Sequence, residues 1–559
     1  MTSAAQGGKM FGRRLPTWAV AIFCALWFVG FYAAAFPNVN FAEGAFIFAV
    51  PFAIWAASAP RWRVFLPTAF ISGWVAWALL LVWLRNLPIP AAAAWGSFIG
   101  LGLVMGLFVM AWLAGLRWWL PRLPEAPVGV RLLAIAGLAG SWVVLEWVRT
   151  WLLTGFPWLP LAAAFWENPL MLAALPWTGS WGLSFVLVFF NLGLAARLRQ
   201  FWPRVQPRGE GEASGRAGRG LCPEFYAALI ALVAGPFGGL LTSANRTAGD
   251  TAGFRAALIQ PNIPAELKWD PGMVQQAWAS VRDKTLAALA GNPEIVLWPE
   301  TATPYPIEHY SQDFMRDLVE EVVRETGVPL LTGNLARPAE DELYNGVFLV
   351  EPDTGLSPRY QAKRKLVPFG EYTPLQGILP LDKVVPIEID TDAGDAPVLL
   401  DTTVGGQPWR FGALVCYEDI FPHLARELVN EGADVLFVAT NNGWYGEEAG
   451  AYQHAAHSVL RAAELRRPVV RCGNNGWSGW IDEMGRIRFV FLPDEGKTIY
   501  AGGWTVVQVD AQSAWRGKRT LYAQWGDWFI LVCGALMGAM WFACRGRRTR
   551  PPPANAPGG

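Results

Sequence analysis

Residues 295–301 read Ile-Val-Leu-Trp-Pro-Glu-Thr, and residues 411–418 read Phe-Gly-Ala-Leu-Val-Cys-Tyr-Glu. Each stretch is a short apolar run that ends in a residue capable of chemistry, Glu300 in the first and Cys416 in the second. Short apolar runs of this kind are typical of buried β-strands. Because layered α/β domains build their sites at strand ends and in the loops that follow them, we predict an α/β domain with Glu300 and Cys416 in its site.

The same alternation of β-rich runs and amphipathic helices continues from Phe254 onward, and it predicts α/β layering. The expected strands are 255–258, 295–297, 329–331, 411–415, 435–439 and 469–471. Two helices are expected from apolar residues at a spacing of four, with Gly432 as the C-cap of the second. Their apolar faces are Phe314, Leu318 and Val322, and Ile420, Leu424 and Leu428.

Composition indicates that part of the chain lies in a bilayer. Of 559 residues, 53% are hydrophobic and only 16% are charged, and the mean hydropathy is +0.26. Apolar runs near the roughly 20 residues needed to cross a membrane predict eight spans. They are 16–36, 43–58, 64–85, 93–116, 132–152, 172–196, 223–242 and 525–544. The first run has an alternative interpretation as a cleaved signal peptide, because basic residues precede it and Ala33–Ala35 resembles a cleavage site.

Basic residues predict the orientation of these spans, because loops rich in Lys and Arg stay in the cytoplasm. Eighteen Lys and Arg residues flank the N-terminus, alternate loops and the C-terminus, against two, Arg85 and Arg149, on the other face. Both termini are therefore expected in the cytoplasm, and the segment between spans seven and eight is expected outside. The predicted organisation is a seven-span region 1–243 with a cytoplasmic loop 203–221, an extracytoplasmic domain 244–522, an eighth helix 523–545 and a tail 546–559.

Several classes of function fit poorly. The net charge is zero, which gives no support to nucleic-acid binding. The six cysteines have no CxxC spacing, so neither a disulfide framework nor a zinc site is indicated. His454 and His457 could bind metal at their spacing of three, but paired histidines on a helix surface are more often structural. Few ionisable residues lie in the spans, with Glu146 and Arg149 as the main exceptions, so transport is not the expected task.

Lys363 is the third candidate for chemistry. It lies in a polar run before Leu366-Val-Pro-Phe-Gly-Glu371. A cysteine at a turn from strand to helix feels the positive end of the helix, which predicts thiolate character for Cys416. Each residue also has an ordinary interpretation: Cys416 as buried filler, Glu300 as a cap and Lys363 as solvated surface. Spacing alone does not decide between them.

Longer motifs carry a resemblance. Trp298-Pro-Glu-Thr301, Lys363 to Glu371 and Cys416-Tyr-Glu418 occur in this order, and they resemble the nitrilase superfamily and its membrane-bound branch, the apolipoprotein N-acyltransferases. The resemblance extends to four further segments, and at Asn441-Asn442 the sequence departs from an expected Asn-Asp pair. The further segments are Glu146-Trp-Val-Arg149, Gly155-Phe-Pro-Trp158, Gln260-Pro-Asn-Ile-Pro264 with Trp269, and Asn441-Asn-Gly-Trp-Tyr-Gly446.

The resemblance implies a fold and a set of roles. The fold is an αββα sandwich inserted between the seventh and eighth spans. Glu300 would be the general base, Cys416 the nucleophile, and Lys363 the cation that holds the oxyanion. Supporting roles near these atoms fall to Glu371, Tyr417 and Glu418, and predicted substrate contacts are Trp269, Asn345 and Arg149. Arg149 would pair with a donor phosphate or else extend to the membrane interface. No metal or cofactor is implied.

The implied reaction moves an acyl chain from a glycerophospholipid such as phosphatidylethanolamine, through a Cys416 thioester, to the α-amino group of an S-diacylglyceryl cysteine that begins an apolipoprotein. The implied location is the bacterial inner membrane, with the catalytic domain in the periplasm. One alternative is a membrane-tethered amidase that uses water as acceptor. A second is a transport or binding protein whose nitrilase-like domain is inactive.

Overall fold

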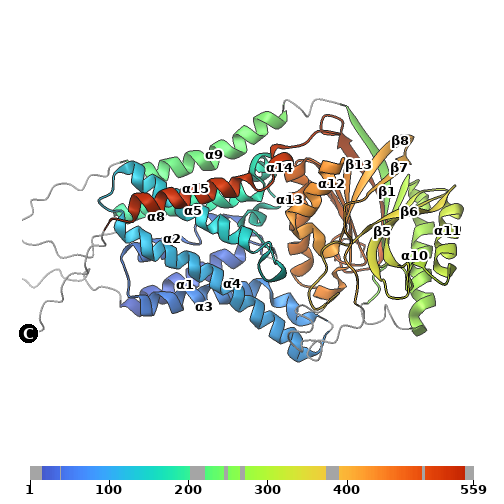
Figure 1. The fold of residues 1–559 in the computed structure, drawn as a ribbon, viewed down its shortest axis with the longest axis horizontal. Coiled ribbons are helices and arrows are strands. Elements are labelled where there is room, and N and C mark those ends of the chain that lie inside the picture. The colour runs from blue at the N-terminus through green and yellow to red at the C-terminus, as the bar shows by residue number, and fades with distance from the viewer. Residues whose placement is uncertain are drawn as a thin grey trace, which may run out of the picture.

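The computed structural model describes residues 16–37, 39–87, 89–201, 221–244, 250–264, 271–372, 390–493, 496 and 498–547. It consists of a helical bundle and a domain with two β-sheets, which lie end to end (Figure 1). The helices α12 (Pro422–Glu431) and α13 (Gly450–Leu465) lie between the bundle and the strands. One continuous apolar core includes residues of the bundle and of both these helices, so the two parts are packed together.

Apolar helices of membrane length make up most of the bundle. In the part of the chain that the structure describes, six helices reach eighteen residues or more with high hydropathy. They are α1 (Thr17–Ala34), α3 (Trp62–Leu80), α4 (Ala91–Trp119), α5 (Val128–Val148), α8 (Ser180–Phe201) and α9 (Pro223–Ala244). The second and eighth predicted spans correspond to shorter apolar helices, Ala42–Ala57 and Trp528–Cys544. The latter helix is α15.

The sequence-based prediction began the sixth span at residue 172, whereas the long helix α8 begins at Ser180. A short helix, α7 (Leu175–Thr178), ends at Gly179, whose φ of 66° lies in the left-handed region, and α8 begins only at Ser180. A Cβ at position 179 would also meet the ring of Tyr522 at 2.6 Å. Gly179 therefore lets the chain turn while it packs closely against the segment that leads into α15.

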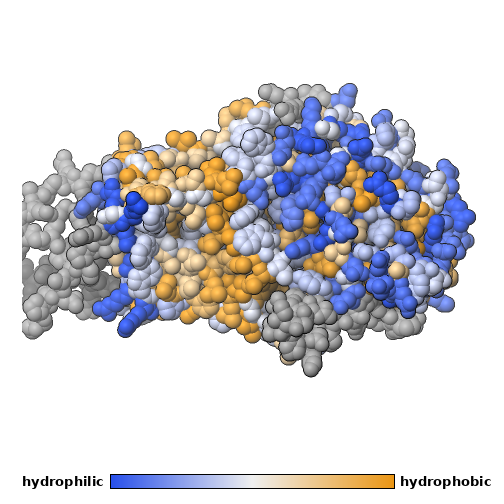
Figure 2. All heavy atoms as spheres, in the orientation of Figure 1, coloured by the Kyte–Doolittle hydropathy of each residue, from blue (hydrophilic) through white to orange (hydrophobic). Residues whose placement is uncertain are grey.

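Polar and apolar surfaces divide the molecule into zones. Apolar atoms form a broad zone over the bundle, with polar atoms over the sheet domain and at the opposite end of the bundle (Figure 2). Basic side chains of two helices contact the segment 57–60: Arg117 Nε, in α4, donates to the carbonyl of Pro60 at 2.7 Å, and Arg199, in α8, donates to the carbonyl of Ala57 at 3.3 Å. The broad apolar zone is typical of a bundle that crosses a bilayer.

Two sheets form the core of the second part. The first has the order β13-β1-β2-β4-β5-β6, with β3 paired to β4, and the second has the order β12-β11-β10-β9-β8-β7. The first-sheet strands are β1 (Thr251–Gln260), β2 (Ile295–Trp298), β3 (Glu308–His309), β4 (Leu330–Arg337), β5 (Tyr344–Glu351), β6 (Gly355–Ala362) and β13 (Gly503–Gln512). The second-sheet strands are β7 (Leu399–Val404), β8 (Gln407–Val415), β9 (Val435–Thr440), β10 (Val469–Gly473), β11 (Gly479–Ile481) and β12 (Ile487–Val490).

Helices cover the outer faces of both sheets, which makes an αββα sandwich. An apolar core lies between the sheets, and another lies between the first sheet and the helices α10 (Val274–Ala288) and α11 (Phe314–Thr326). The second sheet is covered by α12 and α13. The six predicted strands lie within β1, β2, β4, β8, β9 and β10 or overlap them, so the prediction of α/β layering is confirmed.

Both predicted helix faces are confirmed only in part. In α11 the buried residues are Met315, Val319, Val322 and Val323, whereas Phe314 is 57% exposed. Burial follows the helical repeat that starts at Met315. The apolar Phe314 just before it made the predicted repeat start one position too early. In α12, Leu424 and Leu428 are buried and Gly432 is the left-handed C-cap, whereas Ile420 lies in the preceding turn.

Candidate active site

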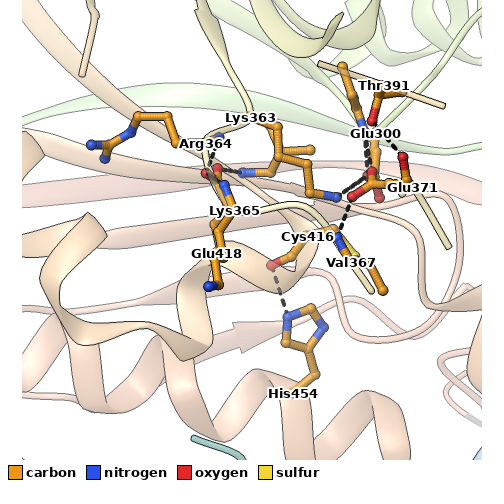
Figure 3. Close-up of polar contacts among 12 residues, drawn as sticks. Glu300, Lys363, Arg364, Lys365, Val367, Glu371, Thr391, Cys416, Glu418 and His454 are labelled. Atoms are coloured by element: carbon orange, nitrogen blue, oxygen red, sulfur yellow. Dashed lines mark hydrogen bonds and ion pairs between the residues drawn. The ribbon is translucent and has the colours of Figure 1, made fainter. Parts of the chain in front are cut away.

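Four polar side chains converge on one point: Glu300 after β2, Asn345 in β5, and Lys363 and Glu371 in the loop after β6. Figure 3 shows Glu300, Lys363 and Glu371 facing one another. The Lys363 ammonium lies 3.2 Å from Glu300 Oε1 and 2.7 Å from Glu371 Oε1. Asn345 Nδ2 donates to the same two oxygens, at 2.9 Å and 3.2 Å. Burial alone would lower the pKa of Lys363, but the two carboxylates outweigh it and raise that pKa well above its usual range. The lysine is therefore held as a cation, and Asn345 fixes both carboxylates around it.

Local sequence explains how Glu300 reaches this point. The β2 strand ends at Trp298, and the Pro299-Glu300 turn passes so close to β4 that a Cβ on Gly333 would lie 2.6 Å from the Glu300 Cα. Only a glycine fits there, because any side chain would push the turn away. A hydrogen bond holds Glu371 in place: its Oε2 accepts the Val367 backbone N–H at 2.8 Å.

Cys416 follows β8 in a strained conformation. Its φ is 50°, in the left-handed region that non-glycine residues rarely adopt. The side chain is buried, and burial together with the charge of Glu300 raises the pKa of the Cys416 thiol to about 12. The prediction of thiolate character is therefore wrong. A five-residue 3₁₀ turn follows Cys416 and α12 begins only at Pro422, so no α-helix starts at the sulfur.

Glu418 connects the end of β8 to the loop that contains Lys363. One of its carboxylate oxygens accepts the backbone N–H of Val415 at 2.8 Å, and the other accepts the backbone N–H groups of Arg364 at 2.7 Å and Lys365 at 3.2 Å. Burial raises the pKa of Glu418, although these donors favour its charged form. Its role in the geometry is to set the distance between Cys416 and Lys363, which lie on different sheets.

Tyr417 connects the turn at Cys416 to the bundle. Its hydroxyl donates to the carbonyl oxygen of Gly155 at 3.1 Å, in the loop after α5. Arg149, the C-cap of α5, is only 5% exposed, with its guanidinium 3.9 Å from Glu146 and over the ring of Trp77 at 5.1 Å. The idea that Arg149 extends to the membrane interface is therefore wrong. Its contact with a donor phosphate stays a prediction, and would require the phosphate to enter the bundle.

His454 is a residue at the site that the sequence reasoning missed. We expected His454 and His457 on a helix surface, but both are completely buried in α13. His454 Nδ1 lies 3.0 Å from Asn442 Nδ2 and 3.3 Å from Arg471, and Nε2 lies beside two oxygen atoms, so Nε2 carries a proton. Nε2 lies 3.0 Å from the Cys416 carbonyl oxygen, which it holds as a hydrogen-bond donor (Figure 3).

The carboxylate of Asp419 places a negative charge beside His454. This carboxylate lies 2.8 Å from His454 Nε2, accepts the Ser458 hydroxyl at 2.5 Å and pairs with Arg471. Burial opposes its ionisation, but His454 and Arg471 outweigh burial and hold the pKa of Asp419 below its usual range. With Asn442 where an aspartate was expected, the carboxylate beside the imidazole is supplied by position 419, which only the tertiary structure reveals.

Two further residues were singled out from the sequence, Trp269 and Gln260. Trp269 lies outside the described residues. Gln260 is structural, because its amide donates to the carbonyls of Ile499 and Ala501 and accepts from Ser478. Among the described residues, no group of three or more His, Cys, Asp or Glu side chains is placed to hold a metal ion.

Comparisons with known proteins agree with this architecture. Residues 255–514 match the carbon-nitrogen hydrolase family, and residues 28–193 match the N-terminal domain of apolipoprotein N-acyltransferase. A crystal structure of an amidase from Nesterenkonia is 17% identical with a TM-score of 0.36, covering 50% of this chain and 95% of that one. The protein is thus a helical membrane protein with a carbon-nitrogen hydrolase domain.

Relatives along the whole chain identify the family. The apolipoprotein N-acyltransferases of Azotobacter vinelandii and Geobacter metallireducens are each 30% identical to this chain. The first match covers 86% of this chain and 92% of the relative, and the second covers 82% and 84%. The chain belongs to the apolipoprotein N-acyltransferase family, and it is an acyltransferase.

Proposed function

We propose that the protein transfers a fatty acyl chain from a membrane glycerophospholipid, such as phosphatidylethanolamine, to the α-amino group of an N-terminal S-diacylglyceryl cysteine of apolipoproteins. The chain passes through a thioester on Cys416. The observation that carries this proposal is the cluster of Glu300, Lys363, Glu371 and Asn345 beside a buried cysteine whose neighbour, Tyr417, contacts the bundle. A nucleophile joined to membrane helices suits substrates that reach it from a bilayer.

In the first half-reaction Glu300 takes the proton of the Cys416 thiol as sulfur attacks the ester carbonyl. The high pKa of the thiol favours transfer of the proton during attack over a preformed thiolate. Lys363 stabilises the oxyanion. The C–O bond then breaks, and the lysophospholipid alkoxide leaves with the proton from Glu300.

In the second half-reaction the free amine attacks the thioester carbonyl while Glu300 accepts a proton from nitrogen. The C–S bond breaks, the amide forms, and the proton returns to the Cys416 sulfur. Ester and thioester are close in free energy, whereas thioester to amide runs downhill, so no other energy source is needed. The kinetics should be ping-pong, with lysophospholipid released first.

For the topology, we propose eight spans in the bacterial inner membrane, with both termini in the cytoplasm and residues 244–522 in the periplasm. Arg117 and Arg199, from two different helices, both contact the segment 57–60, which supports a shared side for these basic residues. A thiol-reactive, membrane-impermeant reagent applied to intact spheroplasts should label a cysteine introduced at exposed Gln508 and leave one introduced at exposed Arg63 unlabelled. The reverse labelling would overturn the orientation.

Acyl trapping tests the reaction. Purified full-length protein in detergent receives a phospholipid with a tagged acyl chain, and intact mass and peptide mapping locate the adduct. We expect an adduct on Cys416 that neutral hydroxylamine removes and that a diacylglyceryl-cysteine peptide discharges. Release of the tagged acid at the same rate with and without peptide would instead support the amidase alternative, with water as acceptor.

A further inference from the structure

We propose that Lys365 binds the phosphodiester of the phospholipid donor while the ester reaches Cys416. This inference rests on the proposed function. Lys365 lies in the same loop as Lys363, but its side chain extends in a different direction (Figure 3). Its ammonium lies 5.0 Å from the centre of the Phe421 ring. Among the described residues, no carboxylate lies within ion-pair distance of it.

Phe421 places this ammonium near both the nucleophile and the bundle. Its ring packs edge-to-face on Tyr417, the neighbour of Cys416, with ring centres 5.1 Å apart. The same ring lies 3.2 Å from where a Cβ on Gly155 would stand, so it contacts the loop after α5. Lys365 is therefore one aromatic ring away from Tyr417 and is also next to the end of a membrane helix.

Interfacial side chains indicate that this is the level of lipid headgroups. The indole N–H groups of Trp147 and Trp181 both donate to Asp527, at the start of α15, at 3.0 Å and 2.9 Å. Tryptophans with an apolar body and a polar contact are typical of the bilayer surface. Large apolar side chains nearby in the chain are exposed, as expected at a lipid boundary: Trp151, Leu152, Leu153, Leu521 and Trp525.

Of the three consecutive basic residues 363–365, Lys365 is the one with no ion pair to any described residue. Arg364 is committed elsewhere, because its guanidinium lies 2.5 Å from Glu427 and donates to the carbonyl of Leu424. Lys363 is enclosed by Glu300 and Glu371. Lys365 is half-buried, and burial lowers its pKa, a cost that an adjacent phosphodiester would offset. A lysine held on an aromatic face at the bilayer surface is well suited to a single phosphate charge.

The test measures Cys416 acylation in single-turnover mass spectrometry with full-length protein in mixed micelles. Three donors with the same acyl chain are compared: phosphatidylethanolamine, diacylglycerol, which lacks the phosphate, and a soluble p-nitrophenyl ester. We expect Lys365→Gln to raise the half-saturating mole fraction of phosphatidylethanolamine about tenfold and to leave acylation by the other two donors unchanged. Lys365→Arg should stay close to wild type.

Arg364→Gln is the matched control, because it removes the same charge from the adjacent residue, whose side chain already pairs with Glu427. It should not change the dependence on phosphatidylethanolamine. An unchanged half-saturation in Lys365→Gln, or an equal loss with all three donors, would overturn the role of Lys365. If wild-type protein is acylated by the p-nitrophenyl ester but never by the phospholipid, the proposed function itself fails, which is a separate outcome.

Discussion

The hydroxyl of Tyr417 donates a hydrogen bond of 3.1 Å to the carbonyl oxygen of Gly155, which joins the residue after Cys416 to the loop that follows the membrane-length helix α5. Gly155 has a φ of 90°, and a Cβ there would meet the Thr150 carbonyl, so the loop has one available shape. This hydrogen bond aligns Cys416 with the bundle. It therefore leads to a prediction of how the enzyme responds to different acyl donors.

Tyr417→Phe should slow Cys416 acylation by a phospholipid several-fold while acylation by a soluble ester changes little. The lost neutral hydrogen bond contributes about 1 kcal/mol, and only a membrane-borne donor depends on alignment with the bundle. Single-turnover acylation with both donors measures the difference. Equal slowing with the two donors would argue against a role in alignment.

His454→Ala should lower kcat about tenfold with little change in either KM, because the Cys416 carbonyl loses the donor that holds its left-handed backbone. His454→Gln should recover part of the rate, since its amide can donate to the same oxygen. Steady-state kinetics give the split between kcat and KM. A loss seen only as lower thermal stability, with normal kcat, would assign His454 to folding alone.

Glu300→Gln should make Cys416 easier to ionise although it abolishes acyl transfer. The negative charge of Glu300 helps to raise the pKa of the thiol to about 12, so its removal should shift the midpoint of alkylation to lower pH. Lys363 lowers that pKa, so Lys363→Met should shift the midpoint upward. Iodoacetamide labelling across pH, mapped to the Cys416 peptide, measures both shifts. Shifts in the same direction would contradict this electrostatic picture.

Arg149→Ala should destabilise the bundle, because Glu146 would lose its buried partner, at a cost of roughly 3 kcal/mol. The double variant Glu146→Gln/Arg149→Ala should recover stability, since the neutral amide oxygen can still accept from Trp142 and from the Leu161 N–H. Thermal unfolding in detergent compares the three proteins. If the single variant is as stable as wild type, Arg149 is free to serve a ligand.

Local sequence was sufficient to predict the strands β1, β2, β4, β8, β9 and β10, and the points at which β2 and β8 end. The runs Ile295–Trp298 and 411–415 could be predicted from composition, because a strand segment buried on both faces is apolar throughout. The edge strands β7 and β12 mix polar with apolar residues, so they were not predicted. The predicted face of α11 began at Phe314, which is apolar but exposed, so that face was only partly right.

By itself, the sequence determined that the chain combines membrane-length apolar helices with an α/β domain, and that Glu300, Lys363 and Cys416 follow strands or precede a distinctive loop. These properties depend on residues that are close together in the chain. Only the tertiary structure decided that Asn345 and Glu371 hold Lys363, that Asp419 and His454 support the Cys416 backbone, and that Arg149 is enclosed by the bundle. Each of these depends on burial and on charges brought together from distant segments, and that proximity exists only after the sheets and helices have packed.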